Sequence, residues 1–131
     1  MTQPSSSPIA IIGGGPAGIE AALTLDAYDQ RAVLVDNQPD PGGQYFKSSP
    51  FESAKSRGTA VLEKLSQSSI QVLTSSSVWG IYPDDKLDGW ILGIQEGQQS
   101  RWLKAGTLIL ACGAYDKPIP FPGWTSPGVL T

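Results

Sequence analysis

The chain has 131 residues, of which 16% are charged, and its net charge is −3 at pH 7; this length is sufficient for one domain with a hydrophobic core. Its Lys and Arg residues form no cluster that would attract nucleic acid, and no apolar run is long enough for a membrane span or a signal peptide, so a cytoplasmic protein is expected. One cysteine and no histidine exclude an internal disulfide, an ordinary zinc site and a histidine-dependent triad within one chain, so neither a catalytic residue nor a metal site is predicted.

The first predicted elements are a short apolar strand, a glycine-rich turn and a helix. After a polar, flexible tail at residues 1–7, the run Ile9–Ile12 predicts a strand that is buried on both faces. The turn has the spacing G-x-G-x-x-G, formed by Gly13, Gly15 and Gly18. Apolar residues at helical spacing predict a helix over Pro16–Ala27. This order of elements is typical of a dinucleotide-binding βαβ unit.

Each residue of the turn has a distinct physical role in such a unit. Gly13 permits the tight turn, Gly15 lets a pyrophosphate approach the backbone, and Gly18 lets the helix pack closely on the strand. Pro16 suits the first helical position, where an N–H has no partner in the helix. The remaining free N–H groups and the helix dipole would face the phosphates. The motif alone is also compatible with a glycine-rich turn that binds nothing.

The next predicted strand, residues 31–35, ends at an acidic residue. Asp36 follows Gly13 by 23 positions, close to the spacing of about 20 expected for an acid that accepts hydrogen bonds from a ribose diol. The alternative for Asp36 is a solvated turn residue. Because its position, charge and context agree with the glycine motif, the sequence predicts dinucleotide binding. With no histidine or cysteine pair, any chemistry has to come from a bound cofactor or from another chain.

The middle of the chain departs from a repeated βαβ pattern. A long loop at residues 37–51 is either functional or a surface excursion; a helix over 52–67 and a third parallel strand over 70–74 follow. Three short strand-like runs then predict an antiparallel meander, at residues 78–82, 90–95 and 101–104. We expect its tryptophans to pack it rather than to form a ligand platform, namely Trp79, Trp90 and Trp102. A last apolar strand covers 107–111, before a proline-rich stretch.

This order of elements resembles the FAD-binding domain of the two-dinucleotide-binding flavoprotein oxidoreductases, the group that includes thioredoxin reductase. The fold class implied over residues 8–131 is α/β: a Rossmann-like FAD-binding βαβ domain with a parallel sheet plus a three-stranded antiparallel meander. Residues 11–18 match the first family motif, and Thr107 to Gly113 resemble the second, which usually ends Ala-Thr-Gly. Cys112 replaces the threonine, and we expect it to be a small buried residue rather than a nucleophile.

The resemblance also implies a set of residues that contact FAD. Residues 41–44 resemble the Gly-Gly-Gln loop that approaches the flavin in the family, and Val78 lies where the family's backbone contacts adenine. The predicted cofactor-binding residues are Gly13, Gly15, Pro16, Ala17, Gly18, Asp36, Asn37, Gly43, Gln44, Val78, Ala111, Cys112 and Gly113.

One branch of the family is more similar than the others. Residues 113–118 and the phrase Phe-Pro-Gly-Trp-Thr-Ser-Pro-Gly-Val at 121–129 resemble the branch that oxidises amino acids. It includes the α subunit of sarcosine oxidase, the A subunit of opine oxidase, the B subunit of hydrogen cyanide synthase, and dye-linked proline and hydroxyproline dehydrogenases. The resemblance implies oxidation of a secondary amine or amino acid by hydride transfer to FAD.

Chains of this family continue into a second, NAD-binding-type domain and then complete the FAD domain. The resemblance therefore implies a domain that is incomplete at its C-terminal end, inactive alone, and dependent on a partner subunit or a further segment. The alternatives are a catalytically silent FAD- or ADP-binding module, or a fragment of a thioredoxin-reductase-like NAD(P)H-dependent flavoprotein. The meander, the Gly-Gly-Gln loop and the second glycine strand argue against half of an NAD-dependent dehydrogenase.

Overall fold

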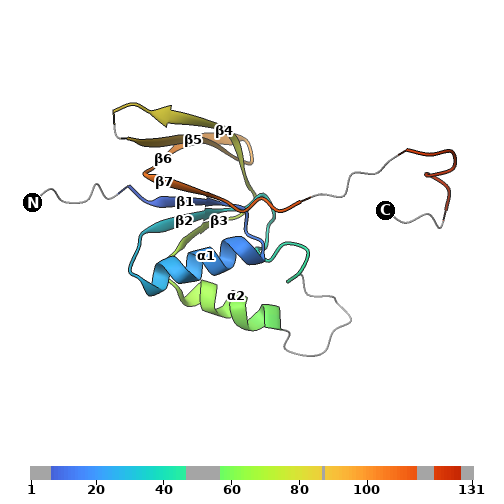
Figure 1. Ribbon diagram of the computed structural model, residues 1–131, viewed down its shortest axis with the longest axis horizontal. Coiled ribbons are helices and arrows are strands. Elements are labelled where there is room, and N and C mark those ends of the chain that lie inside the picture. The colour runs from blue at the N-terminus through green and yellow to red at the C-terminus, as the bar shows by residue number, and fades with distance from the viewer. Residues whose placement is uncertain (1–6, 47–56, 87, 115–119, 128–131) are drawn as a thin grey trace, which may run out of the picture.

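A parallel sheet forms the middle layer of the protein, which is described by a computed structural model over residues 7–46, 57–86, 88–114 and 120–127. Helices cover one face of this sheet and an antiparallel meander covers the other, so that the layers lie one above another in Figure 1. The α/β fold class with a parallel sheet and a three-stranded meander is confirmed.

The parallel sheet has four strands in the order β3-β2-β1-β7. Their bounds, close to those predicted, are β1 Ile9–Ile12, β2 Ala32–Val35, β3 Gln71–Leu73 and β7 Thr107–Leu110. β1 is buried on both faces as expected, because Ala10 packs against the meander while Ile11 packs against the helices. Successive side chains of a strand point to opposite faces, and here both faces are covered.

The two helices in the described part of the chain lie on the lower face of the sheet in Figure 1. α1 spans Pro16–Ala27 as predicted and buries Ile19 and Ala22 against β1 and β2. α2 spans Arg57–Gln67; the predicted start at residue 52 lies outside the described residues, as do residues 1–6 of the predicted tail. Neither described helix is long and apolar enough to cross a membrane.

Hydrogen bonds from Ser69 join the end of α1 to the chain before β3. Asp26 Oδ1 accepts the Ser69 hydroxyl at 2.6 Å and the Ser69 backbone N–H at 2.9 Å. These two bonds outweigh the effect of burial and lower the pKa of Asp26. The carboxylate therefore ties α1 to the sheet layer through the turn that precedes β3.

The meander is longer than the sequence indicated. Its strands are β4 Ser76–Asp84, β5 Gly89–Glu96 and β6 Gln99–Ala105, with a bulge between Val78 and Gly80. Its inner face contributes Leu92 and Ile94, both fully buried against Ala10, Val33 and Val35 of the parallel sheet. The alternation of β5 therefore anchors the meander on the sheet.

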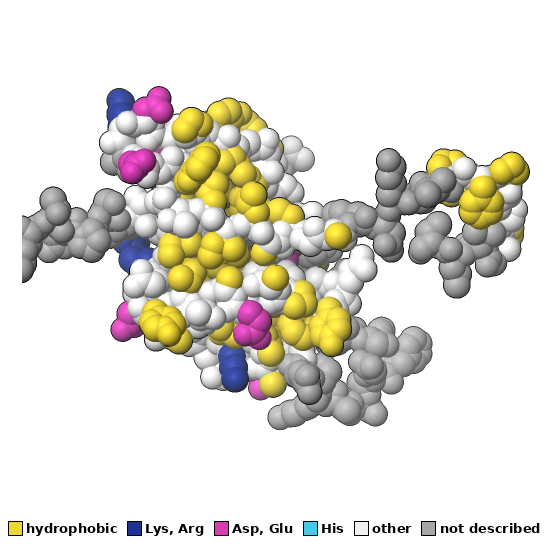
Figure 2. Space-filling model, in the orientation of Figure 1, with side chains coloured by type: hydrophobic (Ala, Val, Ile, Leu, Met, Phe, Trp, Pro, Cys, Tyr) yellow, Lys and Arg dark blue, Asp and Glu magenta, His cyan; other side chains and the backbone are white. Residues whose placement is uncertain are grey.

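The expectation that tryptophans pack the meander requires a correction. The indoles of Trp79 and Trp102 pack edge to face with their ring centroids 5.1 Å apart, but the two residues are 51% and 60% exposed. Trp79 lies over Gly93, which faces away from the buried side chains of Leu92 and Ile94. The rings of Trp79 and Trp102 thus cover the outer face of the meander, and Figure 2 shows hydrophobic side chains exposed over this layer. Trp90 alternates with Leu92 and Ile94 along β5 and therefore lies on the inner side, where it is 39% exposed.

An ion pair between a buried carboxylate and an exposed lysine lies near the hairpin that joins β4 and β5. Asp84 is 6% exposed, and its Oδ2 lies 3.2 Å from Lys104 Nζ without the alignment of a hydrogen bond. Burial raises the pKa of Asp84, but Lys104 and the N–H of Lys86, which Oδ1 accepts at 3.1 Å, outweigh it and hold the pKa below its ordinary value. The pair links the β4–β5 hairpin to β6.

Candidate functional site

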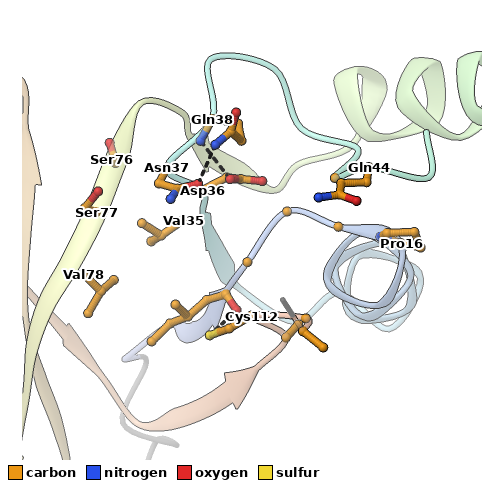
Figure 3. A pocket seen from close by; sticks show the side chains of 18 of the residues that line it. Pro16, Val35, Asp36, Asn37, Gln38, Gln44, Ser76, Ser77, Val78 and Cys112 are labelled. Carbon is orange, nitrogen blue, oxygen red and sulfur yellow. Dashed lines mark hydrogen bonds between the residues drawn. The ribbon is translucent and has the colours of Figure 1, made fainter. Parts of the chain in front are cut away.

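A groove of about 530 Å³ opens at the carboxyl ends of β1, β2 and β7, beside the first turn of α1 (Figure 3). In open parallel sheets this edge is the usual place for a ligand. Predicted residues that line it are Gly13, Gly15, Pro16, Asp36, Asn37, Gly43, Gln44, Val78, Ala111, Cys112 and Gly113. Ala17 and Gly18 do not line it: Ala17 is exposed on α1, and Gly18 is buried beneath the turn.

Two glycines of the motif are required by close backbone contacts. Gly13 has φ +108°, and a Cβ there would overlap Ala111 O and lie 2.6 Å from the carbonyl carbon. A Cβ at Gly18 would overlap Gly13 O, so glycine at this position allows α1 to approach the turn. These two positions therefore serve the packing of β1, β7 and α1.

Gly15 differs because its surroundings are open. It is the N-cap of α1 with φ −75°, no side chain caps the helix, and a Cβ would meet no described atom within 4 Å. The first N–H groups of a helix have no partners within the helix and attract anions. Gly15 therefore leaves space for an anionic group next to the helix N-terminus, as a pyrophosphate requires.

The Asp36 carboxylate lies at the end of β2 and is 6% exposed. Its Oδ1 accepts the Gln38 backbone N–H at 2.9 Å, as the dashed line in Figure 3 shows. The backbone is fixed on both sides, because Asp36 N donates to Leu73 O at 2.8 Å and Asp36 O accepts the N–H of Ser76 at 2.9 Å. A carboxylate held in this way can accept a further hydrogen bond from a hydroxyl in the groove.

The loop after Asp36 returns to the glycine turn. Gly42 N donates to Gly14 O at 2.6 Å, and Gly43, with φ +57°, would place a Cβ 3.1 Å from Gly15 Cα. Phe46 packs against the core beneath the helices, and its ring packs edge to face with that of Tyr45, with the ring centroids 5.3 Å apart. The long loop was expected to be either functional or a surface excursion, and its residues 43–45 form part of the groove. Residues 47–51 of the loop lie outside the described residues.

The residues that follow β7 supply the lower wall of the groove in Figure 3. Ala111 N donates to Ile12 O at 2.8 Å, and Gly113 has φ +72°. Cys112 was expected to be buried, but its side chain is exposed and Sγ lies 3.6 Å from Ile12 O. The expectation was wrong because Cys112 comes two residues after the last residue of β7, at the open end of the sheet.

Several residues of the groove were not predicted. They include Gly14, Gln38, Tyr45, Ser76 and Ser77. Ser76 and Ser77 are the first residues of β4, which the sequence placed two residues later, and no hydrophobic alternation marks them. Gly14 was not predicted because its neighbours Gly13 and Gly15 are the glycines that the motif requires.

Comparisons with known proteins agree with this geometry. The A subunit of opine oxidase from Agrobacterium tumefaciens (strain Ach5) is 32% identical over 133 residues, covering 92% of this chain and 26% of that protein. The alpha subunit of sarcosine oxidase from Rhizobium meliloti (strain 1021) is 32% identical over 139 residues, covering 92% of this chain and 14% of that protein. The chain thus spans about a quarter of the first relative's length and less of the second.

Solved structures and a family profile extend the likeness. The crystal structure of L-proline dehydrogenase from P.horikoshii matches with a TM-score of 0.68 and 29% identity, over 86% of this chain and 24% of that chain. The profile of the pyridine nucleotide-disulphide oxidoreductases matches residues 7–130. The chain therefore belongs to the pyridine nucleotide-disulphide oxidoreductase family, a family of flavin-dependent oxidoreductases.

Proposed function

We propose that residues 8–131 are the FAD-binding domain of a flavin-dependent oxidoreductase. The observation that carries this proposal is the single groove that joins an open helix N-terminus at Gly15 to a buried carboxylate at Asp36. The helix N-terminus suits a pyrophosphate and the carboxylate suits a ribose diol, so together they match the ADP half of a dinucleotide. The family supplies the flavin as the expected second half.

The residues of the groove would bind and orient the cofactor. Asp36 and Asn37 would hold the ribose, the turn at Gly15 would receive the pyrophosphate, and the backbone at Val78 would border the adenine. Gln44, next to Pro16 in Figure 3, and the preceding Gly43 would extend the groove past the pyrophosphate position toward the flavin. When bound, the flavin supplies the capacity to accept a hydride, whereas the protein supplies binding, orientation and electrostatics.

The substrate that we propose is a secondary amine or amino acid of the sarcosine, proline, hydroxyproline or opine class. The support is the set of relatives, which are named as subunits of an opine oxidase and of a sarcosine oxidase, and as an L-proline dehydrogenase. Two of these names denote subunits, so we also propose that this domain works with further polypeptide, in a partner subunit or in the same protein. A catalytically silent module that binds FAD or ADP is the alternative, since this chain spans about a quarter of the opine oxidase relative.

Calorimetric titration of the purified chain with FAD, ADP and FMN tests the proposal. We expect FAD and ADP to bind and FMN, which lacks the adenosine monophosphate part of FAD, to bind at least about tenfold more weakly. Glu63→Gln, on the exposed side of α2 and outside the groove, is the matched control and should bind like the wild type. FMN binding as tight as FAD binding would contradict the assignment of ribose and pyrophosphate to Asp36 and Gly15.

A second measurement separates the enzyme from the silent module. The chain is reconstituted with FAD, once alone and once together with the partner subunit or further polypeptide proposed above. Each preparation is assayed with sarcosine, proline, hydroxyproline and an opine, with a dye as the electron acceptor. Bleaching of the flavin absorbance by one of these substrates supports the oxidoreductase. A bound flavin that none of them reduces in either form supports the module.

A further inference from the structure

We propose that Gly14 is a positioning residue: it sets the place of the Asp36 carboxylate and thereby the preference of the groove for a ribose over a deoxyribose. The inference rests on the proposed dinucleotide function of the groove. It starts from a position that the glycine motif leaves unspecified, since Gly14 is the first x of G-x-G-x-x-G.

The backbone does not require a glycine at this position. The φ of Gly14 lies outside the left-handed region, unlike that of Gly13, so an alanine is compatible with the backbone conformation. The obstacle is a single side chain. The three nearest atoms to a Cβ at Gly14 all belong to Asp36: Oδ2, which it would overlap, Cγ at 2.9 Å and Cβ at 3.0 Å.

Hydrogen bonds hold both backbone segments at this contact. Gly14 O accepts the N–H of Gly42 at 2.6 Å, which ties the turn to the loop after β2. Asp36 is held by hydrogen bonds of its own N–H and carbonyl oxygen to the chain at Leu73 and Ser76. We therefore expect a methyl group at Gly14 to displace the Asp36 carboxylate and to break the 2.9 Å hydrogen bond from Gln38 N to Oδ1.

The displaced carboxylate can no longer serve the ribose in the same way. The Asp36 carboxylate lies next to the glycine turn, and Gln38 donates its hydrogen bond to the other carboxylate oxygen (Figure 3). The acceptor that meets a ribose hydroxyl is thus placed by two contacts, Gln38 on one oxygen and the bare Cα of Gly14 beside the other. Substituting Gly14 should act on the ribose through Asp36, and only weakly on the pyrophosphate.

The test is a mutant cycle read with two nucleotides that differ by one hydroxyl. Dissociation constants for ADP and 2′-deoxy-ADP are measured by calorimetry for the wild type, Gly14→Ala, Asp36→Ala and the double variant. A hydrogen bond to a charged group corresponds to a preference of roughly 10- to 100-fold for ADP in the wild type. Gly14→Ala should bring this preference to within about threefold of unity, as Asp36→Ala does, and the double variant should lose nothing further.

Gly106→Ala is the matched control, because Gly106 has no positive φ and its added Cβ would meet only ordinary contacts at 3.6 Å, outside the groove. It should keep the wild-type preference. The proposal is overturned if Gly14→Ala weakens the binding of ADP and of 2′-deoxy-ADP by the same factor. It is also overturned if Gly14→Ala lowers the affinity for ADP equally in the wild type and in Asp36→Ala.

Melting temperatures of the same variants test the contact without any ligand. Gly14→Ala should lower the melting temperature in the wild-type background and have a smaller effect in Asp36→Ala, which removes Oδ2 and Cγ but keeps Cβ, 3.0 Å from the new methyl group. If Gly14→Ala alone does not fold and the double variant does, the contact is supported; if neither folds although Asp36→Ala does, it is overturned. If the wild type binds neither nucleotide, the proposed function fails, and the melting temperatures still decide the contact.

Discussion

Replacing each glycine of the motif by alanine should separate the residues that the fold requires from the residue that the ligand requires. At Gly13, an L-residue held at φ +108° costs about 1–3 kcal/mol. The added methyl would also overlap Ala111 O, and overpacking of this kind costs about 1–3 kcal/mol more. Gly13→Ala should therefore lose about 2–6 kcal/mol, a large part of the 5–15 kcal/mol typical of a domain.

Gly18→Ala should also destabilise the fold, although alanine is the better helix former by about 0.8–1 kcal/mol. The new methyl would overlap Gly13 O and lie 3.0 Å from the carbonyl carbon, and these backbone atoms cannot rotate away. Because overpacking costs about 1–3 kcal/mol or more, the overlap outweighs the helix propensity. α1 would have to shift away from β1 to accept the substitution.

Gly15→Ala should leave the fold intact and impair binding. With φ −75° and no described atom within 4 Å of the new Cβ, the methyl group fits the folded chain. Alanine lowers the entropy of the unfolded chain, which stabilises the folded state by about 0.4–1 kcal/mol, but it is a poorer N-cap than glycine. The net change in the free energy of unfolding should therefore be below about 1 kcal/mol. In the groove, the methyl would hold a phosphate away from the helix N–H groups, and losing one charge-assisted bond costs about 1.5–3 kcal/mol. ADP affinity should fall roughly 10- to 100-fold.

The assay measures both quantities on every variant, with thermal unfolding for stability and calorimetry for ADP. For domains of this size range, 1 kcal/mol corresponds to a shift in melting temperature of about 2–8 °C, so the losses at Gly13 and Gly18 are measurable. The reasoning fails if Gly15→Ala is folded and binds ADP as tightly as the wild type. It also fails if Gly13→Ala melts no lower than Gly15→Ala.

Two further predictions concern side chains outside the glycine motif. Cys112 is exposed and lines the groove, so ADP or FAD should slow its alkylation by iodoacetamide, measured by intact mass; an unchanged rate would place the ligand elsewhere. Lys104→Met should lower the melting temperature at pH 7, because it leaves the buried carboxylate of Asp84 without its cation, whereas Glu96→Gln, at the exposed pair with Arg101, should have little effect. The pKa of Asp84 is lower in the folded state, so the stabilisation is complete above the ordinary aspartate pKa of about 3.9 and is lost as the pH falls through the lower folded value. The difference between Lys104→Met and the wild type should therefore narrow below about pH 4, and a difference that persists there would refute the ion pair as its cause.

Local pattern was sufficient to predict the strand, turn and helix that form the glycine-motif side of the groove. The bounds of β1 and α1 agree with the sequence, because the apolar run, the glycines and Pro16 each restrict the backbone over a few residues. The start of β4 and the exposure of Trp79 were not predictable in this way. Which face of the meander packs on the parallel sheet depends on contacts of Leu92 and Ile94 with distant strands, and aromatic rings suit either face of a sheet.

The same limit explains why Asp36 was predicted and its dependence on Gly14 was not. The spacing between motif and acid is a sequence property, whereas their contact depends on register: β1 and β2 pair in parallel with Ile12 opposite Val35. This register brings the residues that follow each strand, Gly13 and Asp36, to the same edge of the sheet, and the next residue of the turn then lies under the carboxylate. Once the register is known, the identity of residue 14 follows from the side chain at 36. A side chain shorter than aspartate at position 36 should permit a residue larger than glycine at position 14. A larger residue at position 14 should therefore be tolerated only when position 36 is changed as well.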